Sequence, residues 1–477
     1  MDLKILASEE SQTLRVFDDE SLRADPAALR QLAEGVGGAD LVASPVVLPD
    51  FHHKKNQEMP SSIAVATADS IRPTLTSSSV NCGMALLALN TERPSGAALD
   101  AFFRSVRERY PVPPSNRSEL PRQDVVRAAA EGAAFGAERY GVDDADLERV
   151  ELDGRVDLTP YGGHERLTKD LPWLAFQLAR LRFGTVGPSN HFVELQEVEE
   201  VFDEPTARLL GISQGQLTLQ YHCGGGALAG QIGRMFGRRR NYPKHLRMAM
   251  AVQKPMMHLA SARSRAQLQE RWALYFQDGC PPVSRTSDEG RRLMLANSAA
   301  MNYGFAFRMA TYAALRQLAV DAFGGTPGRL VVDSPHNSVY EETVNGESAI
   351  VHRHNSCRAY PADQMRQGTV FAETGQAVLI PGTHRTSSLL AVTGPQAADS
   401  LYSACHGTGT VIQQFVDSGK SGPDPLGRAT RRYRYNDAEP TVDLHHDDIG
   451  IDHATSILSG YGLVRPVARL RPMAVLH

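Results

Sequence analysis

The sequence predicts an α+β protein, with one large domain over residues 1–477 in which helices surround mixed β-sheets. Helical and strand-like patterns both recur along the chain, and no linker is long enough to separate independent units. Hydrophobic residues make up 42% of the chain and charged residues 22%, which is ordinary for a folded protein with a large core. The length of 477 residues alone would suggest two or three domains, but that prior is soft. We therefore expect a single domain.

Short apolar or alternating runs predict the strands. They are expected at residues 41–43, 46–48, 63–68, 84–89, 191–195, 330–333 and 376–380. The alternation in the fifth of these runs places His191 and Val193 on the face opposite to Phe192 and Glu194. The Ser-, Gly- and Pro-containing stretch 418–427 indicates a flexible polar connection.

Apolar residues at helical spacing predict helices at 21–35, 95–110, 123–140 and 171–183. Asp170 is expected to cap the last of these helices, with Pro172 in its first turn. Residues 244–297 are rich in Arg, Met, Ala and Gln and should be largely helical. Residues 296–323 predict a long Ala-rich helix with apolar residues on most faces, which we expect to be buried.

The formal net charge of −4 indicates that any nucleic-acid contact must come from local basic patches. Residues 1–14 have acidic residues where a signal peptide would need a basic flank, and no run of about eighteen apolar residues occurs. We therefore expect a cytoplasmic protein without a membrane contact. Five cysteines in so long a chain do not form a disulfide framework, and the odd count leaves at least one free.

Reactive side chains recur in short clusters spread over more than three hundred residues. The clusters are Asn81-Cys82-Gly83, Asn190-His191-Phe192, Tyr221-His222-Cys223-Gly224, Pro335-His336-Asn337 and Cys405-His406-Gly407. Taken singly, such residues are more often caps or core residues than ligands. Jointly, a soft thiolate and several neutral imidazoles from separate loops suit manganese, iron or zinc in a site with an open position. Cys280 and Cys357 are better read as small buried hydrophobes.

The order of these motifs resembles the RtcB family of GTP-dependent RNA ligases from about residue 48 to the C-terminus. The matching segments are Pro49-Asp50-Phe51-His52, Cys82-Gly83-Met84, Gly184-Thr185, Asn190-His191-Phe192-Val193-Glu194, His222, Asp333-Ser334-Pro335-His336-Asn337, His352-Arg353, Pro381-Gly382, Cys405-His406-Gly407-Thr408-Gly409 and Ala468-Arg469-Leu470-Arg471-Pro472. The resemblance implies an RtcB-like fold with a central metal and nucleotide cleft. It also implies an RNA ligase that joins 3′-phosphate or 2′,3′-cyclic phosphate ends to 5′-hydroxyl ends, as in RNA repair and tRNA splicing.

The resemblance also implies roles for individual residues. His406 would be the nucleophile that attacks GTP and becomes guanylylated. Cys82, His191, His222 and His336 would hold one or two Mn²⁺ ions, with Cys82 bridging. The positions that would line the nucleotide are Asn190, Phe192, Glu194, Asn337, Pro381, Gly382, Thr383, Ser388, Gly407, Gly409 and His477. The implied partners are the RNA ends and an activating protein.

The chain departs from the family at four places around this site. Ser79 stands where the family has an aspartate ligand of the second metal, so that metal would bind weakly unless Asn81 or a water substitutes. Thr410 replaces an arginine, the stretch 223–226 lacks the usual serine and arginine, and His477 replaces a terminal lysine. These losses keep two alternatives open: a paralogue that binds RNA ends or nucleotide without ligating, and an enzyme that caps 3′-phosphate ends.

Two local basic patches could track an RNA backbone, although a solvated surface is an equally good reading of each. The first patch comprises Arg234, Arg238, Arg239, Arg240, Lys244 and Arg247, with Tyr242 among them. The second comprises Arg428, Arg431, Arg432 and Arg434, with Tyr433 and Tyr435.

Overall fold

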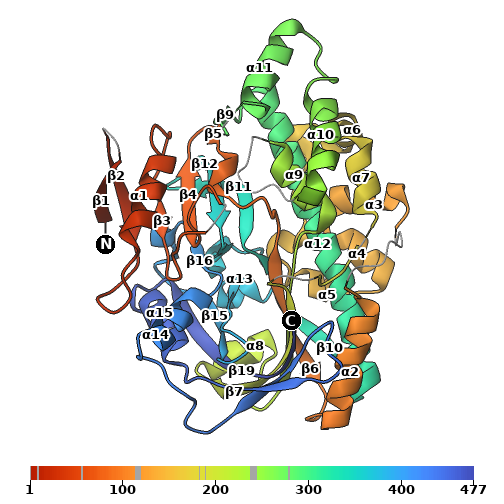
Figure 1. The fold of residues 1–477 in the computed structure, drawn as a ribbon, viewed down its shortest axis with the longest axis vertical. Coiled ribbons are helices and arrows are strands. Elements are labelled where there is room, and N and C mark those ends of the chain that lie inside the picture. The colour runs from red at the N-terminus through yellow and green to blue at the C-terminus, as the bar shows by residue number, and fades with distance from the viewer. Residues whose placement is uncertain are drawn as a thin grey trace.

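The computed structural model describes residues 2–7, 10–54, 57–112, 120–181, 183–187, 190–236, 244–277 and 280–477. It has the predicted mixed α+β architecture (Figure 1). The largest sheet among the described residues has nine strands, in the order β10-β6-β8-β7-β19-β15-β14, with β17 also paired to β19 and β18 paired to β17. Their bounds are β6 Gly83–Asn90, β7 Phe192–Val201, β8 Leu217–Cys223, β10 Thr326–Pro335, β14 Ala377–Ile380, β15 Ser388–Thr393, β17 Ala429–Tyr433, β18 Thr441–Leu444 and β19 Val464–Leu476.

A second sheet has six strands in the order β1-β2-β3-β4-β12-β11. Its strands are β1 Asp2–Ala7, β2 Glu10–Val16, β3 Val46–Val47, β4 Ile63–Thr67, β11 Asn337–Val344 and β12 Glu347–His354. Two short pairs complete the strands: β13 Ser356–Arg358 with β16 Ser403–Cys405, and β5 Ser70–Ile71 with β9 Val283–Ser284. The two large sheets meet where β10 ends at Pro335 and β11 begins at Asn337, so the residue between them, His336, lies at their junction.

The helices lie mostly on one side of the nine-stranded sheet, with α10 and α11 at one end of the molecule (Figure 1). Their bounds are α1 Pro26–Gly35, α2 Gly96–Arg109, α3 Arg122–Glu131, α4 Ala133–Tyr140, α5 Asp144–Leu147, α6 Gly163–Asp170, α7 Trp173–Ala179, α8 Glu204–Leu210, α9 Gly226–Met235, α10 Lys244–His258, α11 Arg265–Tyr275, α12 Asp288–Phe323, α13 Phe371–Thr374, α14 Gly409–Asp417 and α15 Ile449–Gly460.

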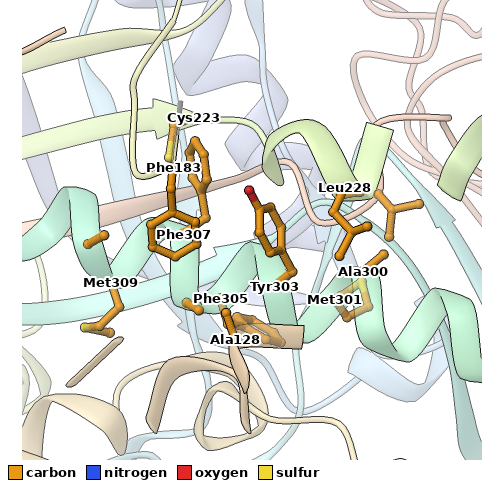
Figure 2. Close-up of a cluster of buried hydrophobic side chains, with 14 of the residues drawn as sticks. Ala128, Phe183, Cys223, Leu228, Ala300, Met301, Tyr303, Phe305, Phe307 and Met309 are labelled. Carbon is orange, nitrogen blue, oxygen red and sulfur yellow. The ribbon is translucent and has the colours of Figure 1, made fainter. Parts of the chain in front are cut away.

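Helix α12 is the central support of this helical layer. It is 36 residues long, which corresponds to about 54 Å, and Ser287 caps its start by accepting from the amide of Gly290. The buried part runs without a break from Arg292 to Tyr312, as expected for a sequence with apolar residues on most faces. Figure 2 shows aromatic and sulfur-containing side chains of α12, including Tyr303 and Phe307, packed with residues of other elements such as Phe183.

Three sequence predictions about helices were wrong in detail. The stretch 123–140 is two helices because Gly132 adopts φ +66°, and a Cβ there would meet the carbonyl oxygen of Gly154 at 2.1 Å. Asp170 ends α6 instead of capping α7, whose cap position is Pro172. The largely helical segment 244–297 is interrupted by β9, and α12 begins eight residues before the predicted start at 296.

The strand expected at 41–43 was also wrong, because Leu41 forms only an isolated bridge to Thr67 and the next two residues lie in a bend. The helix expected at 21–35 begins at Pro26, and the helix expected at 171–183 covers only Trp173–Ala179. The strands expected at 46–48 and 191–195 correspond to β3 and to the start of β7, and the helix expected at 95–110 corresponds to α2. The strands expected at 63–68, 84–89, 330–333 and 376–380 correspond to β4, β6, β10 and β14. No helix in the described part of the chain combines the length and the apolar character needed to span a bilayer.

The packing of Phe183 gives a test of the core. Its ring lies 5.4 Å from that of Tyr303 and 5.7 Å from that of Phe307, and the side chain is buried. Replacing Phe183 with Ala removes these contacts and leaves a cavity, so we expect a loss of about 3–5 kcal/mol in the free energy of unfolding. Urea denaturation measures it. Trp173→Ala is the control, because Trp173 is 52% exposed. An equal loss in both variants would contradict the packing.

Candidate metal centre

Three neighbouring strands of the nine-stranded sheet deliver the ligand candidates. Strand β6 pairs antiparallel with β8 and with β10, so the start of β6 lies beside the ends of the other two. Met84 is opposite His222, and Gly83 is opposite Pro335. Cys82, His222 and His336 are therefore brought to the same edge of the sheet although 254 positions separate the first from the last.

The loops that carry Cys82 and His336 are also tied directly to each other. The amide of His336 donates to the carbonyl of Cys82 at 2.9 Å, and the amide of Asn81 donates to the carbonyl of Asn337 at 3.0 Å. These two backbone bonds cross between the loops on either side of the ligand pair. The distance between the two candidate ligands is thus set by main-chain geometry as well as by side-chain rotamers.

The side chains of Cys82, His222 and His336 form a compact donor set. Their ligand atoms lie within 4.8 Å of one another, and all three residues are buried. Cys82 Sγ is 3.2 Å from His222 Nε2 and 3.6 Å from His191 Nε2. One sulfur and imidazole nitrogens at these separations fit a divalent transition metal. The ring of His191 also lies edge-on to that of His222, with centroids 4.9 Å apart.

Hydrogen bonding and burial prepare the imidazoles for coordination. His222 Nδ1 lies 2.8 Å from the carbonyl oxygen of Asn190, so Nδ1 carries the proton and Nε2 is left with its lone pair toward Cys82. Burial places the pKa of His222 and of His336 well below the usual histidine value, and lowers the pKa of His191 to about 4. All three rings are therefore neutral at physiological pH, which is the form that binds metals.

His406 lies against this donor set. It is in the loop between β16 and α14, and its ring stacks on that of His336 with centroids 3.4 Å apart and planes 13° apart. The ring of His222 is 5.5 Å away. Burial, followed by the charge of Lys54, lowers the pKa of His406 to about 3. The imidazole is therefore unprotonated and keeps a nucleophilic lone pair.

Several of the expected nucleotide-lining residues lie in one hydrogen-bonded network. Gln196 Nε2 donates to Glu194 Oε1 at 2.7 Å and lies 3.3 Å from Ser388 Oγ, which in turn accepts from the amide of Gly382 at 3.2 Å. Burial raises the pKa of Glu194 to about 8, so its carboxyl is largely protonated at neutral pH. Thr383 follows Gly382, and its amide donates to Thr386 at 2.8 Å.

The other nucleotide-lining candidates lie around this network or around His406. Pro381 accepts a hydrogen bond from the hydroxyl of Thr408 at 2.9 Å, which ties it to the loop containing Gly407 and Gly409. Phe192 is 5.8 Å from the His222 ring, and Asn190 contributes its carbonyl to the same histidine.

The last two nucleotide-lining candidates have their side chains engaged by the protein. Asn337 bridges the carbonyl of Ser79 and the amide of Asn355 through its side-chain amide, at 3.3 and 3.0 Å. His477 pairs with Arg432 at 3.1 Å. Burial, followed by the charge of Arg432, lowers the pKa of His384, the neighbour of Thr383, to about 4.

The positions at which the chain departs from the family have defined surroundings. Ser79 lines a cavity of about 280 Å³ together with Cys82, His191 and the glycine-rich turn 224–226. Asn81 cannot take over from a missing carboxylate, because its side chain turns away from this cavity, with Oδ1 accepting from Arg308 and Nδ2 donating to the carbonyl of Met301. Thr410 contacts Asp50 and His52, at 2.9 and 3.1 Å.

Sequence reasoning missed two residues beside the nucleophile loop. Lys54 is partly buried, and its charge acts on Cys82, His336 and His406, lowering the pKa of all three. Asp50 accepts hydrogen bonds from the amides of Thr410 and Val411 at the start of α14. Asp50 stood inside a recognised motif, whereas Lys54 follows it as one of two adjacent lysines and carried no distinguishing signal.

The second basic patch is neutralised by acidic partners. Its arginines pair with acidic residues: Arg428 with Asp424 and Glu199, Arg431 with Asp100, Arg432 with Asp443, and Arg434 with Asp437. Tyr433 is buried and stacks on Phe103 at 4.4 Å, so it is not available to stack on a base. These contacts favour the interpretation of the second patch as a solvated surface with paired charges over its interpretation as an RNA-binding surface. In the first patch, Arg238, Arg239, Arg240 and Tyr242 lie outside the described residues.

The protonation state of Cys82 makes metal binding depend on pH. Burial raises the pKa of its thiol to about 12, so without metal the thiol is protonated throughout pH 6–9. Because the imidazoles are already neutral there, coordination of a divalent ion displaces one proton, and the association constant should rise about tenfold per pH unit. Isothermal titration with Co²⁺ across this range checks the slope. Cys82→Ser should bind far less metal and lose the slope, and an unchanged slope would exclude the thiolate as ligand.

Comparison with known proteins identifies the family of the chain. Residues 31–477 match the family described as tRNA-splicing ligase RtcB. The tRNA-splicing ligase RtcB of Pyrococcus furiosus is 28% identical over 423 residues, which cover 83% of this chain and 39% of the relative. The RNA-splicing ligase RtcB of Mycobacterium tuberculosis is 31% identical over 357 residues, which cover 72% of this chain and 74% of the relative. The chain thus spans about two fifths of the length of the Pyrococcus relative. The chain belongs to the RtcB family.

Proposed function

We propose that the protein is a metal-dependent RNA ligase that joins RNA 3′-phosphate or 2′,3′-cyclic phosphate ends to 5′-hydroxyl ends through a guanylylated His406. The observation that carries the proposal is the stacking of His406 on His336, because it places an uncharged imidazole directly beside a Cys82, His222 and His336 donor set. A nucleophile and a metal site in contact are what the activation of a phosphate requires. Residues 1–477 would act as one catalytic unit.

The chemistry assigned to His406 is nucleophilic. One imidazole nitrogen would form a bond to the α-phosphorus of GTP while the bond to pyrophosphate breaks. The guanylyl group would then pass to the RNA 3′-phosphate, and attack by the 5′-hydroxyl would release GMP. A phosphate oxygen becomes a good leaving group in this way, and a bound Mn²⁺ would neutralise the charge that repels the attacking group.

The metal roles follow from the distances. Cys82, His222 and His336 would hold one Mn²⁺ ion, since their ligand atoms converge within 4.8 Å. His191, 3.6 Å from the sulfur, would serve a second ion on the side of the cavity where Ser79 lies. A serine hydroxyl is a weaker ligand than a carboxylate, so this second ion would bind more weakly than the first.

The nucleotide would occupy the region between the Glu194 network and the His406 loop. Gly382, Thr383 and Ser388 would face the nucleotide from one side, and Gly407 and Gly409 from the other, while Asn190, Phe192, Asn337 and Pro381 would complete the lining. Glu194 would accept from the guanine edge, and that contact would lower its raised pKa. His477 would lie at the rim, beside Arg432.

Specific residues of the chain favour two alternative functions. Thr410, the all-glycine stretch 224–226 and His477 remove positive charge around the phosphates, which favours a protein that binds RNA ends without joining them or one that stops after capping a 3′-phosphate. A cytoplasmic location and the need for an activating protein belong to the same proposal.

Covalent labelling tests the nucleophile. With α-labelled GTP and Mn²⁺, the wild-type chain should retain label after denaturing electrophoresis, and His406→Ala should retain none, because no other group would form the bond. His453→Ala is the matched control, since His453 pairs with Asp19 away from the metal centre. Absence of label in the wild-type chain, with metal bound, would contradict the proposal in favour of the binding alternative. Label with capped but unjoined RNA would identify the capping enzyme.

Restoring the missing carboxylate tests the second ion. Ser79→Asp should add a charged ligand beside Cys82 and His191 and raise the number of Mn²⁺ ions bound per chain from one towards two. Equilibrium dialysis with metal analysis measures the ratio. Ser79→Asn, which has the same shape without the charge, is the control and should not change it. An equal ratio in wild type and Ser79→Asp would show that the serine is not what limits the second site.

A further inference from the structure

A single buried guanidinium lies beneath the metal centre. Arg308 is on α12, and its side chain is fully buried. Its Nη1 donates to both the backbone carbonyl and the side-chain Oδ1 of Asn81, at 2.6 Å each. Its Nε donates to Asp333 Oδ1 at 2.8 Å, and its Nη2 lies 2.7 Å from the same oxygen. One side chain thus contacts the residue before Cys82 and the residue three before His336.

These contacts define the conformation of the Cys82 loop. Asn81 has φ +54°, a left-handed conformation that non-glycine residues adopt rarely, so it needs support from its surroundings. Arg308 supplies that support at two acceptors of the same residue. Gly83, on the other side of Cys82, has no room for a side chain, because a Cβ there would lie 2.7 Å from the carbonyl oxygen of Ser334 and 2.9 Å from the guanidinium carbon. The arginine therefore packs against the turn on both sides of Cys82.

The other side of the Arg308 guanidinium contacts Asp333, which precedes the loop that contains His336. Asp333 lies on β10, which continues directly into His336, and its main chain pairs with Ala85 of β6. The planar guanidinium fixes the angle between its two sides, so a movement of the Asn81 turn would be transmitted to β10. Helix α12 is held in turn by the core packing around Tyr303 and Phe307 (Figure 2).

We propose that Arg308 is a positioning residue that sets the spacing between Cys82 and His336, so that metal affinity depends on the forked shape of this side chain and not only on its charge. The proposal rests on the metal centre of the proposed function. Helix α12 provides no candidate ligand, but through Arg308 it would control the geometry of the ligands.

The test uses Co²⁺ binding to the full chain freed of metal. Arg308→Lys keeps the positive charge but cannot reach Asp333 and Asn81 at once. We expect its dissociation constant for Co²⁺ to be at least about tenfold higher than in wild type, the scale on which groups that orient ligands act. The sulfur-to-cobalt charge-transfer absorption per bound ion should also weaken, which a mere loss of stability would not cause.

Arg271→Lys is the matched control. Arg271 is also a buried arginine whose Nε donates to a carboxylate, Glu289, at 2.6 Å, and whose Nη1 donates to the carbonyl of His258 at 3.1 Å. Its hydrogen-bond partners in the described part of the chain are Glu289, His258 and Ser261, which lie outside the metal centre. This variant should lose stability to a similar extent in thermal unfolding and bind Co²⁺ like wild type. Equal Co²⁺ affinity and absorption in Arg308→Lys and Arg271→Lys would overturn the proposal.

If Arg308→Lys does not fold, Asn81→Gly tests the role of Arg308 instead. It keeps the backbone carbonyl and tolerates φ +54°, but removes one of the two acceptors on the Cys82 side and leaves the Asp333 pair intact. It should weaken Co²⁺ binding in the same direction, and wild-type binding would overturn the proposal. If the wild-type chain itself binds no Co²⁺, the metal centre and this inference fail together. Binding that all variants share leaves the metal centre standing and removes only the role of Arg308.

Discussion

The antiparallel pairing of β6 with β8 and β10 is the constraint on which the site depends. Because β6 runs opposite to both neighbours, its first residue lies beside their last ones, and residues far apart in the chain meet at one sheet edge. A shift of either register by a single residue would turn His222 to the other face of the sheet or move His336 along the edge. The metal centre is thus a property of strand register, and the backbone bonds between the Cys82 and His336 loops secure that register locally.

The clustering of Cys82, His222 and His336 could be predicted from the sequence, whereas the residues that support this cluster could not. Thiol and imidazole side chains are typical metal ligands, and Cys82 and His336 adjoin a glycine and a proline at strand ends, while His222 lies two residues before Gly224, so a local pattern indicates all three. Arg308 is one arginine in an alanine-rich helix, more than 220 positions from the turn that it holds, and nothing near it in sequence distinguishes it from the partly exposed Arg291. Its importance comes from the three-dimensional contacts alone.

Long-range pairing also explains the other differences between expectation and structure. The arginines at 428–434 resemble a nucleic-acid surface only while their partners are unknown, since Asp100 and Glu199 approach them from elements hundreds of positions away. The break at Gly132 has the same origin. A lone glycine is tolerated within a helix. Here, however, the backbone of Gly154 comes so close to Gly132 that no side chain fits, and the positive φ of Gly132 changes the direction of the chain. Elements made of long apolar runs, such as α12 and β6, were predictable because they are buried along most of their length.

The balance of charge bears on how many metal ions the site can hold. The imidazoles are neutral, so the Cys82 thiolate is the one anionic donor in the set, and Ser79 adds no charge on the side of His191. Lys54 contributes a positive charge that acts on Cys82, His336 and His406. One divalent ion is favoured by the thiolate. A second divalent ion would add two positive charges near an ammonium group without a carboxylate to offset them, and it would become favourable when the phosphates of a nucleotide bring their own negative charge. A second ion would then bind together with the nucleotide, and Lys54 would supply part of the positive charge that a permanently bound second ion would bring.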